Sequence, residues 1–120
     1  MIVRTVQLAK WRKVKELGIE LLDTTVKSGI KTYAPSWDIV RGVKSGEITE
    51  AEYTVRYIVL LHESYLARRK EWLDLIKKDS IAIACYCSPG KFCHRHILAD
   101  VLEKICQRQG IPFENKGEIT

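Results

Sequence analysis

Three of the chain's four cysteines, two of its three histidines, a lysine and an arginine lie between residues 85 and 96. Thiols and imidazoles can serve as nucleophiles, acid–base groups or metal ligands. Lys91 and Arg95 add positive charge that can bind an anion. This spacing predicts that a functional site, if the chain has one, is centred on residues 85–96.

The residues around this segment predict a strand, a loop and a helix. The apolar run of residues 81–84 is typical of a strand buried on both faces. Apolar residues at helical spacing follow in 97–102. A helix that begins after the loop directs free N–H groups and its positive dipole end at an anion. The sequence therefore predicts a phosphate-binding loop built from Cys87, Ser88, Gly90, Lys91, Phe92, Cys93, His94, Arg95 and His96.

Two other kinds of chemistry remain open for the same residues. Cys93 has basic neighbours that favour a thiolate, but Arg95 lies eight residues after Cys87, so the Cys-x5-Arg spacing of thiol phosphatases is absent. A cysteine that simply packs at the helix start is the favoured interpretation of Cys93. Zinc could use the thiols with His94 and His96, yet no Cys-x2-Cys pair is present and Cys85 falls in the buried strand. The favoured interpretation thus contains no metal and no cofactor.

Length and composition predict one α/β domain over residues 1–120. The chain is 46% hydrophobic and 29% charged, as in an ordinary globular protein. Neither a membrane span nor a signal sequence is recognisable, which predicts a cytoplasmic protein without a membrane partner. Cysteines in that compartment are expected as thiols or metal ligands. The net charge of +5 permits an anionic partner, but the basic residues are dispersed, which favours a small molecule over nucleic acid.

Strands and helices alternate along the chain, which predicts a small Rossmann-like sandwich with a mostly parallel sheet of about four strands. Thr49 and Glu52 form a capping box that opens a long helical segment with a break between 64 and 70. The other expected elements are strands 1–9, 19–22, 80–85 and 111–114 and helices 10–17, 37–44 and 94–109. Right-handed crossovers place Gln7, residues 23–25 and loop 87–95 at one edge of the sheet.

The Cys-Tyr-Cys of residues 85–87 and the Cys-His-Arg of residues 93–95 resemble the family catalogued as domain of unknown function 488. An apolar strand ending in cysteine, a short loop and Cys-His-Arg opening a helix mark that family. The Ala-Pro-Ser-Trp segment at 34–37 is similar to short versions carried by bacteriophages. The chain lacks the arginine that longer members carry directly after the acid of the second strand, here Asp23. The resemblance implies a Rossmann-like fold and a role in nucleotide-centred conflict between phages and bacteria.

These observations lead to one favoured function and two alternatives. The favoured function is binding of a nucleotide-like anion, for instance a host immune signal sequestered by a phage protein. Loop 87–95 would hold the phosphate, Asp23 would accept a hydrogen bond from a ribose hydroxyl, and Tyr33 or Trp37 would cover the base; Thr24 is a further expected ligand-binding residue. The first alternative is a hydrolase or glycosidase acting on nucleotides or nucleic acid, with Cys93, His94 and Asp23 as candidate catalytic residues. The second is a DNA- or RNA-binding module, and a homodimer is compatible with each of the three.

Overall fold

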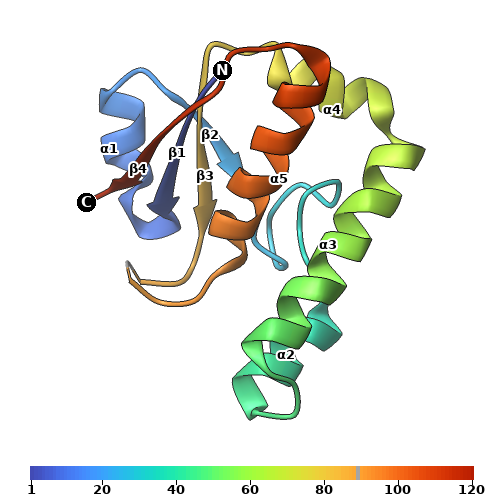
Figure 1. Cartoon of the computed structure of the whole chain (residues 1–120). Coiled ribbons are helices and arrows are strands. Elements are labelled where there is room, and N and C mark those ends of the chain that lie inside the picture. Colours follow the sequence, from blue (N-terminus) through green and yellow to red (C-terminus); the bar gives the residue numbers. More distant parts are fainter. Residues whose placement is uncertain (89) are drawn as a thin grey trace.

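Four parallel strands form one sheet in the order β2-β3-β1-β4 (Figure 1). They are β1 (Ile2–Gln7), β2 (Glu20–Asp23), β3 (Ser80–Cys85) and β4 (Glu114–Ile119). The structure is a computed structural model that describes residues 1–88 and 90–120; Pro89, part of the expected turn, lies outside the described residues. The predicted α/β fold with a mostly parallel sheet is confirmed.

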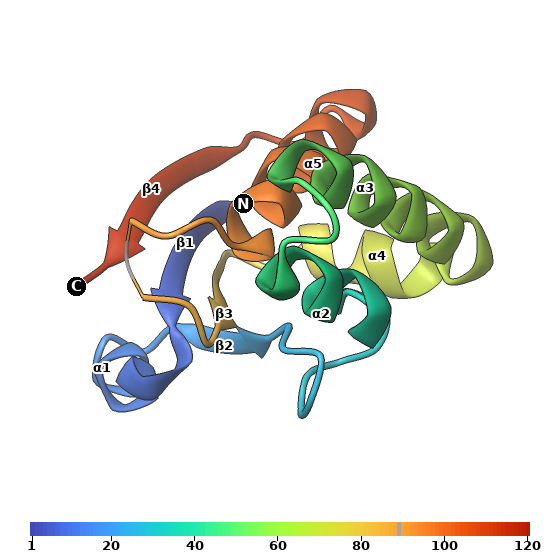
Figure 2. The same cartoon turned by 90° about the horizontal axis from the view of Figure 1, so that it is seen from below.

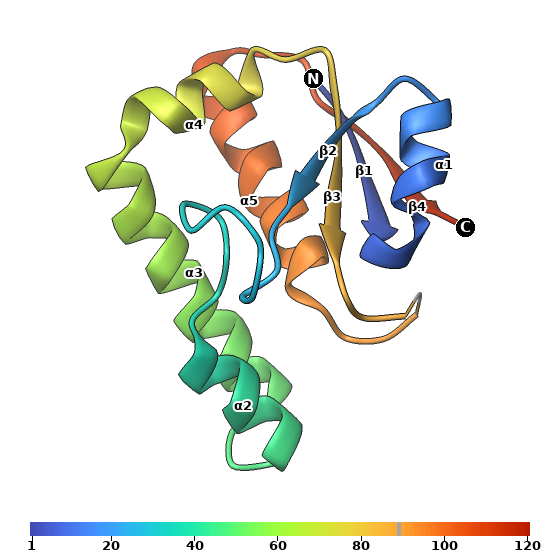
Figure 3. The same cartoon turned by 180° about the vertical axis from the view of Figure 1, so that it is seen from behind.

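Helices cover both faces of this sheet. A short 3-10 turn (Leu8–Lys10) and α1 (Trp11–Glu16) lie on one face, and α5 (His94–Gln109) lies on the other (Figures 1 and 3). Outside α5 lie α3 (Glu50–Ala67) and α4 (Arg69–Ile76), and α2 (Trp37–Ser45) packs against α3. Within the described residues, no helix combines the length and apolar content that crossing a bilayer requires.

Local sequence signals explain where the longest helices begin and end. The Thr49 hydroxyl accepts a hydrogen bond from the Glu52 backbone N–H at 3.0 Å, which confirms the N-cap at the start of α3. The expected break falls between Ala67 and Arg69, where α3 gives way to α4. Apolar residues recur at helical spacing along α3 and α4 and form a stripe, of which Tyr57, Leu61 and Trp72 are buried. The stripe therefore forms the core between these helices and the sheet.

The register of the strands sets the position of the site. Gln7 pairs with Cys85 and Asp23 pairs with Ala84, so the last residues of three strands lie at one edge of the sheet. Figure 2 views the molecule from the side of this edge. The Gln7 amide lies 3.5 Å from the Tyr86 carbonyl, and the Thr24 hydroxyl donates to the Ala84 carbonyl at 2.9 Å. The predicted convergence of these segments is confirmed.

The last strand differs from the prediction. The sequence analysis placed it at 111–114, because those residues are the apolar ones, but β4 runs from Glu114 to Ile119. β4 is an edge strand with largely exposed residues, so an apolar pattern is not required of it. Its pairing with β1 shifts register between Val3 and Arg4, and Gly117 has a φ of +85°. The shift moves Glu118 opposite Thr5, whose hydroxyl donates to the Glu118 carboxylate at 2.6 Å.

Candidate functional site

A cavity of about 300 Å³ opens where β2 and β3 end and α2, α3 and α5 approach. Its lining combines four aromatic side chains, two lysines, three cysteines and one histidine. These residues are Trp37, Tyr53, Tyr86, Phe92, Lys27, Lys44, Cys85, Cys87, Cys93 and His94. The edge formed by the carboxyl ends of parallel strands is the usual ligand site of open α/β sheets. The cavity is therefore the candidate site.

His94, the first residue of α5, has one tautomer set by its surroundings. Its Nε2 lies 2.7 Å from the Thr24 carbonyl oxygen, which can only accept, so Nε2 carries the proton. The Thr24 hydroxyl, 3.1 Å away, already donates to Ala84 and can only accept from that same Nε2–H. The Nδ1 lone pair is consequently free and lies 3.7 Å from Cys93 Sγ. Burial lowers the pKa of His94 to about 4, so the ring is neutral at pH 7.

The buried guanidinium of Arg95 already has an anionic partner. Its side chain has no exposed surface and donates to both carboxylate oxygens of Glu118, at 3.1 and 3.0 Å. It also donates to Cys85 Sγ at 2.8 Å and to the carbonyls of Cys87 and Ser88 at 2.9 and 3.5 Å. The prediction that Arg95 binds the phosphate of a ligand is contradicted, because Glu118 neutralises its charge and the surrounding protein occupies its donors.

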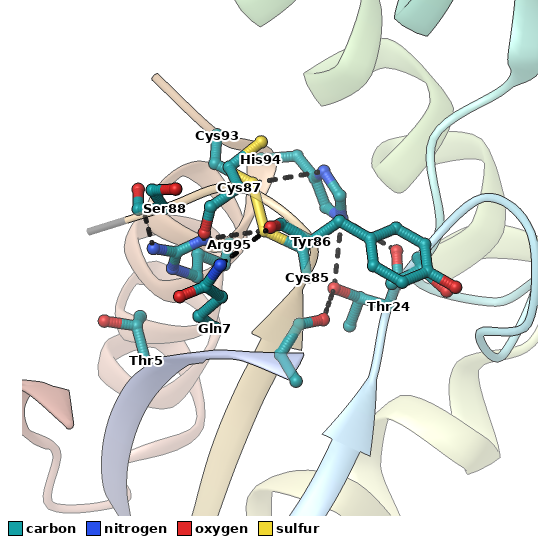
Figure 4. The surroundings of a disulfide bond; sticks show 12 residues. Thr5, Gln7, Thr24, Cys85, Tyr86, Cys87, Ser88, Cys93, His94 and Arg95 are labelled. Atoms are coloured by element: carbon teal, nitrogen blue, oxygen red, sulfur yellow. Dashed lines mark hydrogen bonds between the residues drawn. A yellow bond between two sulfur atoms is a disulfide. The ribbon is translucent and has the colours of Figure 1, made fainter. Parts of the chain in front are cut away.

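Cys85 and Cys93 are joined by a disulfide across the start of α5 (Figure 4). Thiols or metal ligands are expected at both positions from the sequence, so the disulfide differs from the prediction there. Cys85 ends β3, Cys93 caps α5, and both side chains are buried. Cys87 is a free, partly buried thiol in the lining of the same cavity. Figure 4 shows His94 on one side of the disulfide and Arg95 on the other.

Asp23 and its neighbours shape the segment after β2. One Asp23 oxygen accepts from the Thr25 backbone N–H at 2.9 Å, and the other accepts from the Ser28 hydroxyl at 2.8 Å. Thr24 is fully buried beneath His94. The side chains of Asp23 and Thr24, both predicted to bind the ligand, are thus engaged in local contacts, and their neighbours Thr25 and Lys27 line the cavity.

Gly29 closes this segment, and replacing it with alanine is expected to be destabilising. A Cβ at Gly29 would lie 2.4 Å from both the backbone nitrogen and the backbone oxygen of Thr25, so the segment would have to move. We expect Gly29→Ala to lower the free energy of unfolding by about 1–3 kcal/mol. Urea denaturation measures the change, and Lys31→Ala at an exposed neighbour is the control, with an expected change within about 0.5 kcal/mol. Equal stability of the two variants would contradict the steric argument.

The two aromatic residues predicted to cover a base have different positions. Tyr33 is buried, and its ring meets the Trp72 ring edge-on with centroids 4.7 Å apart, so Tyr33 belongs to the core and the prediction for it is wrong. Trp37 is 48% exposed and lines the cavity, with the Arg41 guanidinium 5.5 Å from its ring centroid. Of these two predicted residues, Trp37 is therefore the one that can contact a bound ligand.

The predicted loop residues divide into two groups. Cys87, Phe92, Cys93 and His94 line the cavity, and Phe92 packs edge-on against Tyr53 at 5.3 Å. The second group is exposed and lies outside the lining: Ser88, Gly90, Lys91 and His96. Gly90 has a φ of +81°, which suits a turn at the loop tip.

Two lysines and two tyrosines of the lining are not among the predicted site residues: Lys27, Lys44, Tyr53 and Tyr86. A signal for Lys44 was present, because it lies seven residues after Trp37 on a helix and so shares its face. Lys27 lies four residues after Asp23, the last residue of β2, close to the edge of the sheet where a ligand is expected. Tyr53 belongs to the apolar stripe of α3. It is indeed buried, with its pKa raised by burial, but its ring also reaches the cavity.

One of the comparisons with known proteins gave a match. The family model DUF488-N3a, described as the active DUF488-N3 subclade, matches residues 4–106. No curated protein and no solved structure matches the chain. The matched range contains every lining residue named above and ends before β4.

Proposed function

The chain belongs to the DUF488 family, since the matched model spans residues 4–106 of 120, and from this premise we propose that its cavity binds a phosphate-containing nucleotide or a nucleotide-derived small molecule. The observation that carries the proposal is the combination of four aromatic side chains with two lysines in one cavity. Aromatic faces suit a nucleobase, and lysine ammonium groups suit a phosphate.

The size and position of the cavity support a small ligand. About 300 Å³ lies at the lower end of the range for small-molecule sites and suits a ligand of mononucleotide size better than a polymer. Lys27 and Lys44 are exposed on two different segments, so their ammonium groups can meet a phosphate at the mouth of the cavity. In this arrangement Trp37 and Tyr53 contact the base, and the phosphate is bound by lysines outside the loop predicted to bind it.

The phosphate assignment predicts a difference between Lys44→Gln and Lys91→Gln. A charge-assisted hydrogen bond contributes about 1.5–3 kcal/mol, so Lys44→Gln should weaken binding at least about tenfold. Lys91 is exposed and lies outside the lining, so Lys91→Gln should leave the affinity unchanged. Calorimetric titration with nucleoside mono- and diphosphates, beside the matching nucleosides, measures both. If the double variant Lys27→Gln/Lys44→Gln bound a nucleotide with the wild-type affinity, the proposal would be contradicted.

From the family resemblance we propose that this chain is a bacteriophage protein that removes a host immune signal. It would do so by sequestering the nucleotide signal in the cytoplasm. Sequestration requires release of the ligand intact. The protein should therefore be incubated with a bound nucleotide and denatured, and the released compound identified by mass spectrometry. An unchanged mass supports sequestration.

Catalysis on the same ligand is the second candidate, favoured by one specific observation. His94 presents an unprotonated Nδ1 to Cys93 Sγ at 3.7 Å, an arrangement that can activate the thiol once the disulfide is reduced. The word "active" in the description of the matched model agrees with it. Release of hydrolysed or base-free ligand by reduced protein, and its loss in Cys93→Ala, would establish a hydrolase or glycosidase in place of a binding protein.

A further inference from the structure

Cys85, Cys93 and His94 bring three soft ligand atoms together at the inner end of the cavity. Within the described residues, this is the group of His, Cys, Asp or Glu side chains whose ligand atoms all lie within 4.8 Å of one another, and all three residues are buried. They come from the end of β3 and the start of α5, two rigid elements that fix their positions. We propose that, once the disulfide is reduced, these residues bind a zinc ion whose fourth ligand position faces the cavity.

The orientation of His94 fits a metal ligand. Its Nε2–H donates to the Thr24 carbonyl at 2.7 Å, which leaves the Nδ1 lone pair free toward Cys93 Sγ, 3.7 Å away. Zinc-bound histidines characteristically donate their second ring N–H to a carbonyl or carboxylate in this way, which fixes the tautomer and the ring plane. The Thr24 carbonyl thus already serves as the outer hydrogen-bond partner that such a site requires.

The backbone spacing of the two cysteines also suits two ligands of one ion. Their Cα atoms lie 7.5 Å apart, beyond the span of about 4.4–6.8 Å usual for disulfides. Two thiolates at about 2.3 Å from a tetrahedral zinc have sulfurs roughly 3.7 Å apart. Little movement of β3 or α5 is therefore needed when the bond between the sulfurs is replaced by two bonds to zinc.

The charges of the surroundings balance in the proposed complex. Two thiolates neutralise the divalent ion, and the neighbouring Arg95 is itself neutralised by Glu118 at 3.0 Å. The Arg95 N–H that contacts Cys85 Sγ at 2.8 Å would remain as an outer donor to a zinc-bound sulfur. Because the protein supplies three ligands, the fourth position is left for water or a cavity ligand, the pattern of catalytic zinc sites.

The disulfide is converted to the zinc site in two steps, reduction of the bond and binding of the ion. A thiol reductant supplies two electrons and two protons to the Cys85–Cys93 bond, giving two thiols while the reductant becomes a disulfide. Zinc then displaces one proton from each thiol, so two protons are released for each ion bound. His94 releases none, because its Nδ1 carries no proton in the tautomer set by Thr24.

Zinc titration of the reduced, chelator-treated protein tests the proposal. With a chromophoric chelator as competitor, we expect about one zinc ion per chain, and cobalt in its place should show thiolate-to-metal charge transfer and tetrahedral d–d bands. Cys85→Ser and Cys93→Ser should each weaken binding by more than about 100-fold, beyond the 10–100-fold effect of outer-shell changes. The matched control Cys106→Ser replaces a free cysteine that lies outside both the cluster and the cavity lining, and it should bind zinc as wild type.

A second measurement uses only the wild-type chain and so does not depend on the folding of the variants. Zinc should protect Cys85 and Cys93 from alkylation by iodoacetamide, with peptide mass spectrometry as the readout, and should leave Cys87 reactive. Absence of zinc binding by reduced protein, equal protection of all cysteines, or undiminished binding in Cys93→Ser would overturn the proposal. Zinc binding is measured without nucleotide, so its failure is distinguishable from failure of nucleotide binding.

Discussion

Replacing Glu118 with alanine is expected to lower the free energy of unfolding by about 3–5 kcal/mol, because it leaves the Arg95 guanidinium charged, buried and without its anion. The Arg95 side chain has no exposed surface, and that of Glu118 is 17% exposed, so water cannot replace the lost carboxylate fully. The Thr5 hydroxyl loses its acceptor in the same variant. Chemical denaturation at pH 7 measures the change.

Two further variants distinguish the energetic effect of burying an ion pair from the effect of forming one. Glu20→Ala breaks the Glu20–Lys78 pair, whose side chains are 53% and 42% exposed, and should cost less than about 1 kcal/mol. The double change Arg95→Met/Glu118→Leu removes both buried charges and should be more stable than Glu118→Ala alone. If Glu118→Ala and Glu20→Ala proved equally mild, the buried pair would not have the structural importance assigned to it.

Acidification from pH 7 to pH 4 should cost the zinc-free, oxidised protein about 3 kcal/mol through His94 alone. Burial lowers the pKa of His94 to about 4 in the folded chain, whereas the unfolded chain protonates near the ordinary value of 6.5. Between these values the unfolded state binds one proton more, so stability rises with pH and is lost as the pH falls through the window. The interval of about 2.5 pH units at roughly 1.4 kcal/mol each sets a limit of about 3.5 kcal/mol, and about 3 kcal/mol of it is lost at pH 4, where the folded His94 is half protonated.

The contribution of His94 is isolated by comparing pH profiles of the free energy of unfolding. His94→Gln keeps an N–H donor for the Thr24 carbonyl but cannot take up the proton, so its profile between pH 6.5 and 4 should be flatter than that of wild type. His62→Gln, at an exposed position on α3, is the matched control and should retain the wild-type slope. Parallel profiles for wild type and His94→Gln would contradict the assigned cause.

The elements that form the core of the fold could be predicted from sequence because each carried a local signal. The apolar run that ends in Cys85 identified β3, and the Thr49–Glu52 capping box placed the start of α3. Parallel strands joined by right-handed crossovers then required their carboxyl ends to share one edge, which brought Thr24 and His94 together. The topology alone thus predicts at which edge of the sheet the candidate site lies.

The partners of individual side chains could not be predicted in the same way. Glu118 lies in a polar edge strand that has no apolar pattern, so nothing in the sequence connected it with Arg95, and the guanidinium was assigned to a ligand. Tyr33 lies in an irregular segment, where an exposed side chain is expected, yet its ring is buried against Trp72. Both errors concern long-range contacts, which short-range spacing does not determine.

The composition and bulge of β4 also have a consequence for how this molecule behaves among its copies. An edge strand offers unpaired N–H and C=O groups that can recruit a strand from another chain and start aggregation. Here the edge carries the exposed charges of Glu114 and Lys116, and its register shift with β1 and the positive φ of Gly117 interrupt a regular ladder. Charge and irregularity therefore disfavour the pairing of β4 with a strand of another copy.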